Sequence, residues 1–296
     1  MKIIFSQSAL YPYKPDEAFA EEYVAAKNAG FETLLFDYDN LSTSRIVPTD
    51  NPETIIYRGW MLTSRQYSDL YAQLFKKNYK LINEPQEYEN CHYLPDSLQF
   101  ISNYTPKTIF QKHEDENDID FIIEEAKIFG PNPVIIKDYV KSEKHYWKNA
   151  CFVEDATNSS KLREVIKTFI DLRGSSLNVG IVVREYIDLK NISVHSKSNM
   201  PLSEEYRLFF LNHSLLEIYN YWEEGEYNTE LPDIKQFKEI AISISSNFFT
   251  MDIAKTKNDK FIIIELGDGQ VAGIPEKEDK NKFYQDVYSL FNKGIN

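Results

Sequence analysis

The chain has 296 residues, 42% of them hydrophobic and 27% charged, a composition that predicts a folded protein of two or three lobes and excludes a disordered one. Its formal net charge of −13 argues against nucleic acid as a partner. The sequence has no apolar run of roughly 18 residues and no charged-then-apolar leader, so we expect neither a membrane span nor a membrane partner. Cys91 and Cys151 lack metal-site spacing and are too few for a disulfide framework, which is typical of a cytoplasmic protein.

The first third of the chain alternates between predicted strands and helices. Apolar runs predict strands at residues 2–5, 33–37 and 54–58, and helical spacing predicts helices at residues 16–29 and 64–78. Such alternation is typical of a parallel sheet covered by helices. We therefore predict an N-terminal α/β lobe over residues 1–105.

Two further units are predicted beyond this lobe. The central unit, residues 106–186, has predicted strands at 108–111, 134–137 and 180–185 and predicted helices at 117–129 and 159–173. The C-terminal unit, residues 187–296, is richer in hairpins. Its predicted elements are strands at 206–211 and 215–221, a helix at 233–247, a hairpin over 248–268 and a helix at 278–291.

The hairpin at residues 248–268 is the most informative of these elements. Two apolar, β-branched runs flank the turn-forming pair Asn258-Asp259. If a two-residue turn joins them, residue 257 pairs with residue 260, and Asp252 lies directly opposite Glu265. A four-residue loop with the same centre gives the same pairing. The other face is then wholly apolar, and it carries Met251, Ile253, Ile262, Ile264 and Leu266.

The opposition of Asp252 and Glu265 suggests a ligand site. Two carboxylates that face each other across a sheet repel and destabilise it. A divalent cation relieves this repulsion, and Mg²⁺ favours one or two carboxylates together with phosphate oxygens. The alternative is a solvated edge hairpin that carries two unrelated acids.

Charged residues recur at the ends of the other predicted strands. Strand 134–137 ends in Lys137 and is followed by Lys141, and strand 180–185 ends in Arg184-Glu185. The strand at 206–211 begins Glu205-Tyr206-Arg207. Together with the hairpin, this order resembles the ATP-grasp superfamily, and more narrowly its clade marked by an arginine and two lysines. The resemblance covers nearly the whole chain, and its most specific parts are residues 264–270 and 137–141.

The resemblance implies an ATP-grasp fold, α/β with α+β lobes, that is preceded by an N-terminal parallel α/β pre-grasp lobe. It implies that Lys137 and Lys141 bind ATP phosphates and that Arg207 contacts the transferred phosphate or an acyl phosphate, a task for which its planar fork is suited. It also implies a nucleotide-binding hinge between the lobes, in which main-chain atoms bind adenine and a carboxylate binds ribose. The hinge residues are Arg184, Glu185, Tyr186, Ile187 and Asp188.

The resemblance further implies that Asp252 and Glu265 hold Mg²⁺, with Mn²⁺ as an alternative. Many members of the superfamily have an asparagine two residues after the glutamate, where this chain has Gly267. We expect Asp268 to serve as the third metal ligand in its place.

Arg58 is the candidate substrate-binding residue of the first lobe. It ends a predicted strand, and the carboxyl ends of parallel strands are where α/β sheets bind ligands. We expect it to hold a carboxylate or phosphate of the substrate. The alternative is a structural ion pair with Asp37 or Glu84.

The expected activity is that of an ADP-forming ligase. It would use ATP to convert a carboxylate into an acyl phosphate that an amine or related nucleophile then attacks, and its substrates would be small molecules, peptides or proteins. Two alternatives stay open: a phosphotransferase of the same fold, and a nucleotide-binding interaction protein without turnover.

Overall fold

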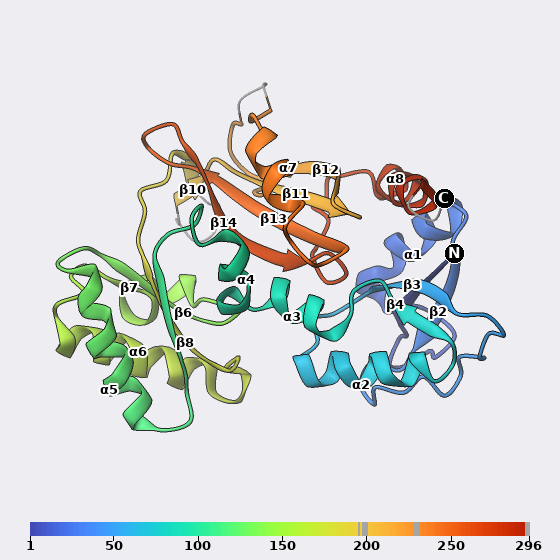
Figure 1. The fold of residues 1–296 in the computed structure, drawn as a ribbon, viewed down its shortest axis with the longest axis horizontal. Helices are drawn as coiled ribbons and strands as arrows, with labels where there is room; N and C mark the ends of the chain where they lie inside the picture. Colours follow the sequence, from blue (N-terminus) through green and yellow to red (C-terminus); the bar gives the residue numbers. More distant parts are fainter. Residues whose placement is uncertain (195, 197–200, 228–230, 294–296) are drawn as a thin grey trace.

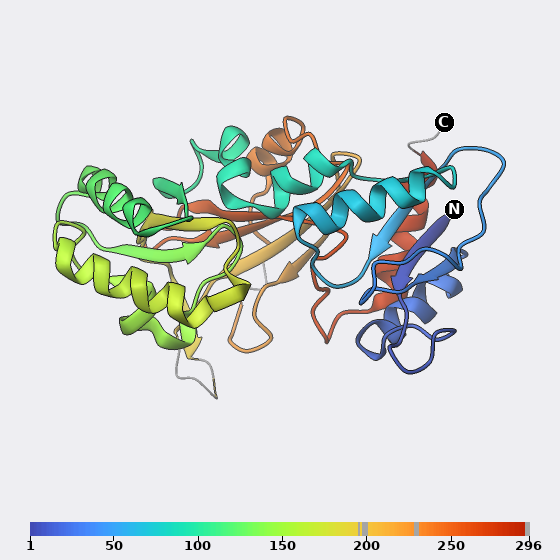
Figure 2. The same cartoon turned by 90° about the horizontal axis from the view of Figure 1, so that it is seen from below.

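The computed structural model describes residues 1–194, 196, 201–227 and 231–293. The described residues form three four-stranded sheets and a separate two-stranded one. Figures 1 and 2 show the N-terminal and central sheets at the two ends of the molecule, with the C-terminal sheet between them. Among the described helices, none is both long enough and apolar enough to cross a bilayer.

The N-terminal sheet is wholly parallel, as the sequence predicts. Its strand order is β2-β1-β3-β4, and its strands are β1 (Lys2–Ser6), β2 (Glu32–Phe36), β3 (Glu53–Arg58) and β4 (Tyr79–Leu81). The helices of this lobe are α1 (Ala20–Asn28) and α2 (Ser64–Phe75). A capping box at Thr63 starts α2, which buries Tyr67, Leu70 and Leu74 at helical spacing.

The central sheet is antiparallel and has the order β5-β8-β6-β7. Its elements are β5 (Thr108–Lys112), α5 (Glu116–Glu125), β6 (Val134–Asp138), β7 (Phe152–Val153), α6 (Ser159–Arg173) and β8 (Gly180–Glu185). The two helices cover one face, where Ile122 and Phe169 pack with Ile136 and Val183. Strand β8 ends at Glu185, within the predicted hinge.

The C-terminal sheet is also antiparallel, with the order β12-β11-β13-β14. Its strands are β11 (Glu205–Leu211), β12 (Ser214–Asn220), β13 (Phe248–Lys255) and β14 (Phe261–Asp268), and β9 (Asn191–Val194) and β10 (Pro201–Ser203) form the two-stranded sheet. The last helix, α8 (Lys280–Lys293), returns to the N-terminal lobe and lies beside α1 (Figure 1). Phe283 and Tyr284 thereby join Phe5 in one core.

Two short helices that the sequence did not predict connect the N-terminal and central lobes. They are α3 (Pro85–His92) and α4 (Leu94–Ile101), and each has a proline in its first turn, where the missing amide hydrogen costs nothing. Both contact β14 of the C-terminal sheet. They therefore place His92 and Leu94 beside that sheet.

The predicted helix at residues 233–247 is too long. The observed helix, α7, spans only Lys235–Ala241. Beyond it, the backbone amide and the hydroxyl group of Ser243 both donate to the carbonyl of Ile240. Serine side chains that compete for backbone carbonyls in this way favour turns over helix interiors, and residues 243–246 include three serines.

The register of the 248–268 hairpin confirms one prediction and corrects another. Near the turn, Lys255 pairs with Phe261 and Ile253 with Ile263, one residue away from the predicted register. A β-bulge at Ile264 then restores it, so that Asp252 pairs with Glu265 as predicted. The bulge also changes which side chains are buried, because Ile263 joins Met251, Ile253 and Leu266 in the core in place of Ile262 and Ile264.

Arg58 connects the N-terminal lobe to the loop after β14 and does not face a substrate cavity. Its side chain is 1% exposed, and its Nε and Nη2 donate to Oε2 of Glu22 at 3.0 and 2.7 Å. Its Nη1 donates to the carbonyls of Gly269 and Ala272 at 2.7 and 2.9 Å. Four of the five donors are thus occupied by protein groups. The expected substrate contact is corrected to a buried structural one, and its partner is Glu22 instead of Asp37 or Glu84.

This assignment predicts a large loss of stability in the variant Arg58→Ala. The substitution leaves Glu22 and two carbonyls buried without their donor, which should lower the free energy of unfolding by about 3–5 kcal/mol in urea titrations. The matched control is Arg163→Ala, which breaks a surface ion pair with Asp120 and should cost at most about 1 kcal/mol. Equal effects of the two substitutions would contradict the structural role of Arg58.

Candidate functional site

The candidate site is a cavity between the three lobes. Its volume is about 260 Å³, and its floor is one face of β11, β13 and β14. The charged residues that line it include Lys141 from the central lobe and Arg207, Asp252 and Glu265 from the C-terminal sheet. His92 and Met61 close it from the side of the N-terminal lobe.

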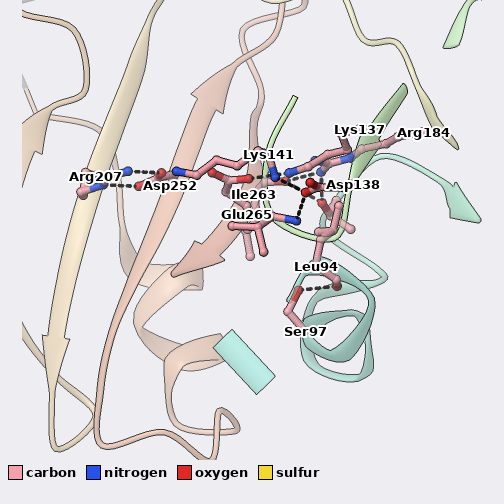
Figure 3. A network of polar contacts seen from close by, with 12 residues as sticks. Leu94, Ser97, Lys137, Asp138, Lys141, Arg184, Arg207, Asp252, Ile263 and Glu265 are labelled. Atoms are coloured by element: carbon pink, nitrogen blue, oxygen red, sulfur yellow. Dashed lines mark hydrogen bonds and ion pairs between the residues drawn. The ribbon is translucent and has the colours of Figure 1, made fainter. Parts of the chain in front are cut away.

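Four charged side chains follow one another across this site (Figure 3). Arg207 pairs with Asp252 across β11 and β13, and Asp252 pairs with Glu265 across β13 and β14. Lys137, at the end of β6, reaches Glu265 from the central sheet. The order is therefore cation, anion, anion, cation, so each of the two facing carboxylates has a cation on its outer side.

The pair of Lys137 and Glu265 joins the central and C-terminal lobes. Nζ of Lys137 lies 2.9 Å from Oε2 of Glu265, and the two side chains are 7% and 33% exposed. Burial alone would raise the pKa of Glu265, but the ammonium group of Lys137 outweighs it and brings the pKa to about 2. Glu265 is therefore ionised at neutral pH.

The pair of Arg207 and Asp252 is bidentate. Nε and Nη2 of Arg207 donate to the two carboxylate oxygens at 2.9 and 2.7 Å, and Asp252 is 3% exposed. Burial would lower the pKa of Arg207, but the carboxylate holds it above its usual range. The guanidinium group also lies over the ring of Tyr221, 4.9 Å from the ring centroid. Its orientation at the cavity wall is therefore fixed.

Lys141 is presented to the cavity by a tight turn. The carboxylate of Asp138 accepts the backbone amides of Val140 and Lys141, and it is itself held by Arg173 at 3.1 Å. Figure 3 shows the side chain of Lys141 extending toward the two carboxylates. Loss of water around it lowers the pKa of Lys141, an effect that Glu265 opposes. Its ammonium group has no ion pair among the described residues. Asp138 belongs to the Lys-Asp-x-x-Lys element of the sequence, but its role in holding this turn was not predicted.

The predicted hinge residues differ in what they offer to a ligand. The amides of Glu185 and Tyr186 donate to the carbonyls of Lys107 and Pro133, whereas the Ile187 amide has no partner among the described residues. Asp188 is exposed and lies 3.2 Å from Nζ of Lys257. Of these residues, Ile187 and Asp188 have groups available for adenine and ribose.

Arg184, which we expect at the hinge, has a buried side chain, and its Nε has no hydrogen-bond partner among the described residues. Its guanidinium group is 3% exposed and donates to the hydroxyl group of Thr105 and, at 3.5 Å, to the carbonyl of Ile263. Burial lowers the pKa of Arg184 to about 10, although Glu265 opposes the shift. Arg184 therefore connects β8 with β14 at the back of the cleft.

Asp268 is also corrected from its expected role. It is fully buried, and its carboxylate accepts the amide group of Asn83 at 2.6 Å and the backbone amide of Gln270 at 2.9 Å. Burial raises the pKa of Asp268 to about 7, despite these hydrogen bonds. A carboxylate so enclosed holds the N-terminal lobe to the C-terminal sheet and is a poor metal ligand.

The remaining two carboxylates fit a metal that arrives with phosphate. Among the described residues, no group of three or more acidic, histidine or cysteine side chains is close enough to hold a metal ion without help. Asp252 and Glu265 supply oxygen ligands that face each other, which suits Mg²⁺ when phosphate oxygens complete its coordination.

Comparison with known proteins identifies the family. The family model for the ATP-grasp domain, R2K clade family 3, matches residues 128–287, which is more than half of the chain. The chain belongs to this ATP-grasp family. The matched segment contains all four residues of the charged row, which are Arg207, Asp252, Glu265 and Lys137. No curated protein sequence matches the chain.

Solved structures show the ATP-grasp fold over nearly the whole chain. The RimK-domain ATP-grasp protein of Sphaerobacter thermophilus is 13% identical, with a TM-score of 0.60 and coverage of 98% of this chain and 100% of the other. The ATP-grasp ligase PsnB, solved with a minimal precursor, Mg and ADP, is 12% identical, with a TM-score of 0.58 and coverage of 98% of both chains. D-alanyl-alanine synthetase A of Vibrio cholerae is 10% identical, with a TM-score of 0.53 and coverage of 99% of both chains. At these identities the likeness shows the fold alone.

The pKa of Glu265 predicts how its contribution to stability changes with pH. Because the folded pKa of about 2 lies below the ordinary 4.5, the ionised carboxylate stabilises the fold above about pH 4.5, and this stabilisation is lost as the pH falls toward 2. In urea titrations, the free energy of unfolding of the wild type should exceed that of Glu265→Gln by about 1–2 kcal/mol at pH 6. This difference should shrink toward pH 3.

The control for this measurement is Glu164→Gln, which removes an exposed acid paired with Lys161. Its difference from wild type should stay near zero at both pH values. A difference for Glu265→Gln that does not depend on pH would show that Lys137 does not hold the carboxylate ionised.

Proposed function

We propose that the chain is an ADP-forming ATP-grasp ligase that binds Mg-ATP between residues 106–186 and 187–296. The charged row of Arg207, Asp252, Glu265 and Lys137 is the observation that carries the proposal. The two facing carboxylates support it, because a metal and a triphosphate would replace their ion pairs with Arg207 and Lys137. The unpaired ammonium group of Lys141 adds a further cation for phosphate.

The hinge supports ATP as the nucleotide. Adenine presents a donor and an acceptor on one edge, and an extended backbone can satisfy both. The free amide of Ile187 supplies the donor, and the exposed Asp188 lies one residue further on for the ribose hydroxyl groups. Lys137 and Lys141 then reach the phosphates from the same side of the cleft.

The proposed reaction has two steps. A carboxylate oxygen of the acceptor forms a bond to the γ-phosphorus as the bond to the bridging oxygen breaks, which gives an acyl phosphate and ADP. An amine nitrogen then attacks the acyl carbon, inorganic phosphate leaves, and the amine loses a proton to solvent. Mg²⁺ bound by Asp252 and Glu265 would neutralise phosphate charge.

The chain's own residues contribute mainly position and charge. Lys137 and Lys141 would hold the phosphates, and the rigid fork of Arg207 would bind the transferred phosphoryl group or the acyl phosphate. Arg58, Arg184 and Asp268 would act indirectly, because they fix the lobes around the cavity. The acceptors would be small-molecule, peptide or protein carboxylates.

The proposal predicts that Lys137→Ala weakens Mg-ATP binding. Loss of a charge-assisted hydrogen bond should reduce the affinity by about 1–3 kcal/mol in calorimetric titrations. The control is Lys127→Ala, which removes an exposed lysine of the same lobe and should leave the affinity unchanged.

Two results would count against the proposal. Unchanged Mg-ATP affinity in Lys137→Ala would remove Lys137 from the nucleotide site. ADP release that gives no hydroxamate when hydroxylamine is present would favour the phosphotransferase, because hydroxylamine traps an acyl phosphate but not an ordinary phosphate ester.

A further inference from the structure

We propose that the end of the cavity around Thr250 and Gly267 is the acceptor subsite, and that it accepts a monocarboxylate with a compact, uncharged body. The inference rests on the proposed function and specifies its substrate class. It is carried by the position of this end along β13, by the space that Gly267 leaves for the hydroxyl group of Thr250, and by the charges of the cavity wall.

The position of Thr250 follows from the strand. The hinge lies at the turn end of the hairpin, where Asp188 contacts Lys257 and Leu189 pairs with Thr256. Asp252 lies further along β13, and Thr250 lies roughly 7 Å beyond it on the same face. Adenine at the hinge would place the phosphates near Asp252, so Thr250 lies on the far side of the transferred phosphate.

Thr250 and Gly267 form the floor at this end. They pair across β13 and β14, two residues from Asp252 and Glu265, and both line the cavity. A Cβ atom at Gly267 would lie 2.6 Å from Oγ1 of Thr250, so the glycine leaves the space that this hydroxyl group occupies. Thr250 lines the cavity, which its hydroxyl group reaches without a hydrogen bond to another described residue. This hydroxyl group is therefore available to donate to, or accept from, a ligand in the cavity.

The cavity that Thr250 lines also has walls without charge. Met61, Leu94, Val271 and Ala272 are apolar. His92 stacks on Tyr88, and burial lowers its pKa to about 4, with Lys141 acting in the same direction, so it is neutral at pH 7. These residues would contact the body of an acceptor, and they favour a compact apolar one.

The charged lining residues are already assigned. Asp252 and Glu265 have their cations, and the carboxylate of Asp268 is hydrogen-bonded inside the protein. Arg207 and Lys141 face the transferred phosphate. A second charge on the acceptor would therefore be buried without a partner, at a cost of several kcal/mol. The small cavity volume, which the phosphates share, also limits the size of the body.

The first test uses three acids with the same four-carbon chain: butyrate, succinate and 4-aminobutyrate. Each is supplied with Mg-ATP and hydroxylamine, and hydroxamate and ADP are measured. Butyrate should give a kcat/KM at least tenfold above the other two, and 4-phenylbutyrate should be poorer than butyrate. Preference for succinate or 4-aminobutyrate, or no hydroxamate from any of them while Mg-ATP binds, would overturn the inference and leave the nucleotide site standing.

The second test removes the hydroxyl group of Thr250. Thr250→Val keeps the shape of the side chain and should raise KM for butyrate at least tenfold, whereas Thr250→Ser should restore it. Calorimetric affinity for Mg-ATP and the melting temperature should stay at the wild-type values. The matched control is Thr168→Val on the exposed face of α6. An unchanged KM in Thr250→Val would refute the subsite. A wild-type protein that does not bind Mg-ATP would refute the proposed function.

Discussion

The opposition of Asp252 and Glu265 across β13 and β14 is the constraint on which the site depends. Two facing carboxylates destabilise a sheet unless cations accompany them. The protein supplies these cations from opposite directions, because Arg207 comes from the neighbouring strand and Lys137 comes from another lobe. The same interaction that stabilises the sheet thus joins the two lobes that would enclose a nucleotide. Mg-ATP carries both charges needed to replace the ion pairs.

The N-terminal lobe gives this cleft its third wall. Arg58 holds the carbonyls of Gly269 and Ala272, and Asn83 and Gln270 enclose the carboxylate of Asp268. All of these contacts involve the end of β14 and the loop that follows it. Arg58 and Asp268, which the sequence suggested as ligand-binding residues, therefore hold this segment in place. The cavity thereby keeps its shape next to the charged row.

Local patterns in the sequence predicted what depends on local structure. Period-2 alternation and a turn signal placed Asp252 opposite Glu265, and charged residues at strand ends indicated the other members of the charged row. The pattern did not predict the bulge at Ile264, because simple alternation contains no extra residue. The sequence also did not predict contacts between residues far apart in the chain. Arg58 pairs with Glu22 from another element, and the buried contact of Asp268 comes from a residue 185 positions away. The role proposed for Thr250 became visible only once Gly267 was seen beneath its hydroxyl group.

The most direct measurement is the affinity of the protein for Mn²⁺ with and without ADP, followed by the electron paramagnetic resonance signal of free Mn²⁺. If Asp252 and Glu265 are held by Arg207 and Lys137 until nucleotide arrives, Mn²⁺ alone should bind weakly. Saturating ADP should then tighten its binding at least tenfold, and Mn²⁺ should tighten ADP binding by the same factor. Asp252→Asn should abolish this coupling. Equal Mn²⁺ affinity with and without ADP, or coupling that survives in Asp252→Asn, would contradict the account.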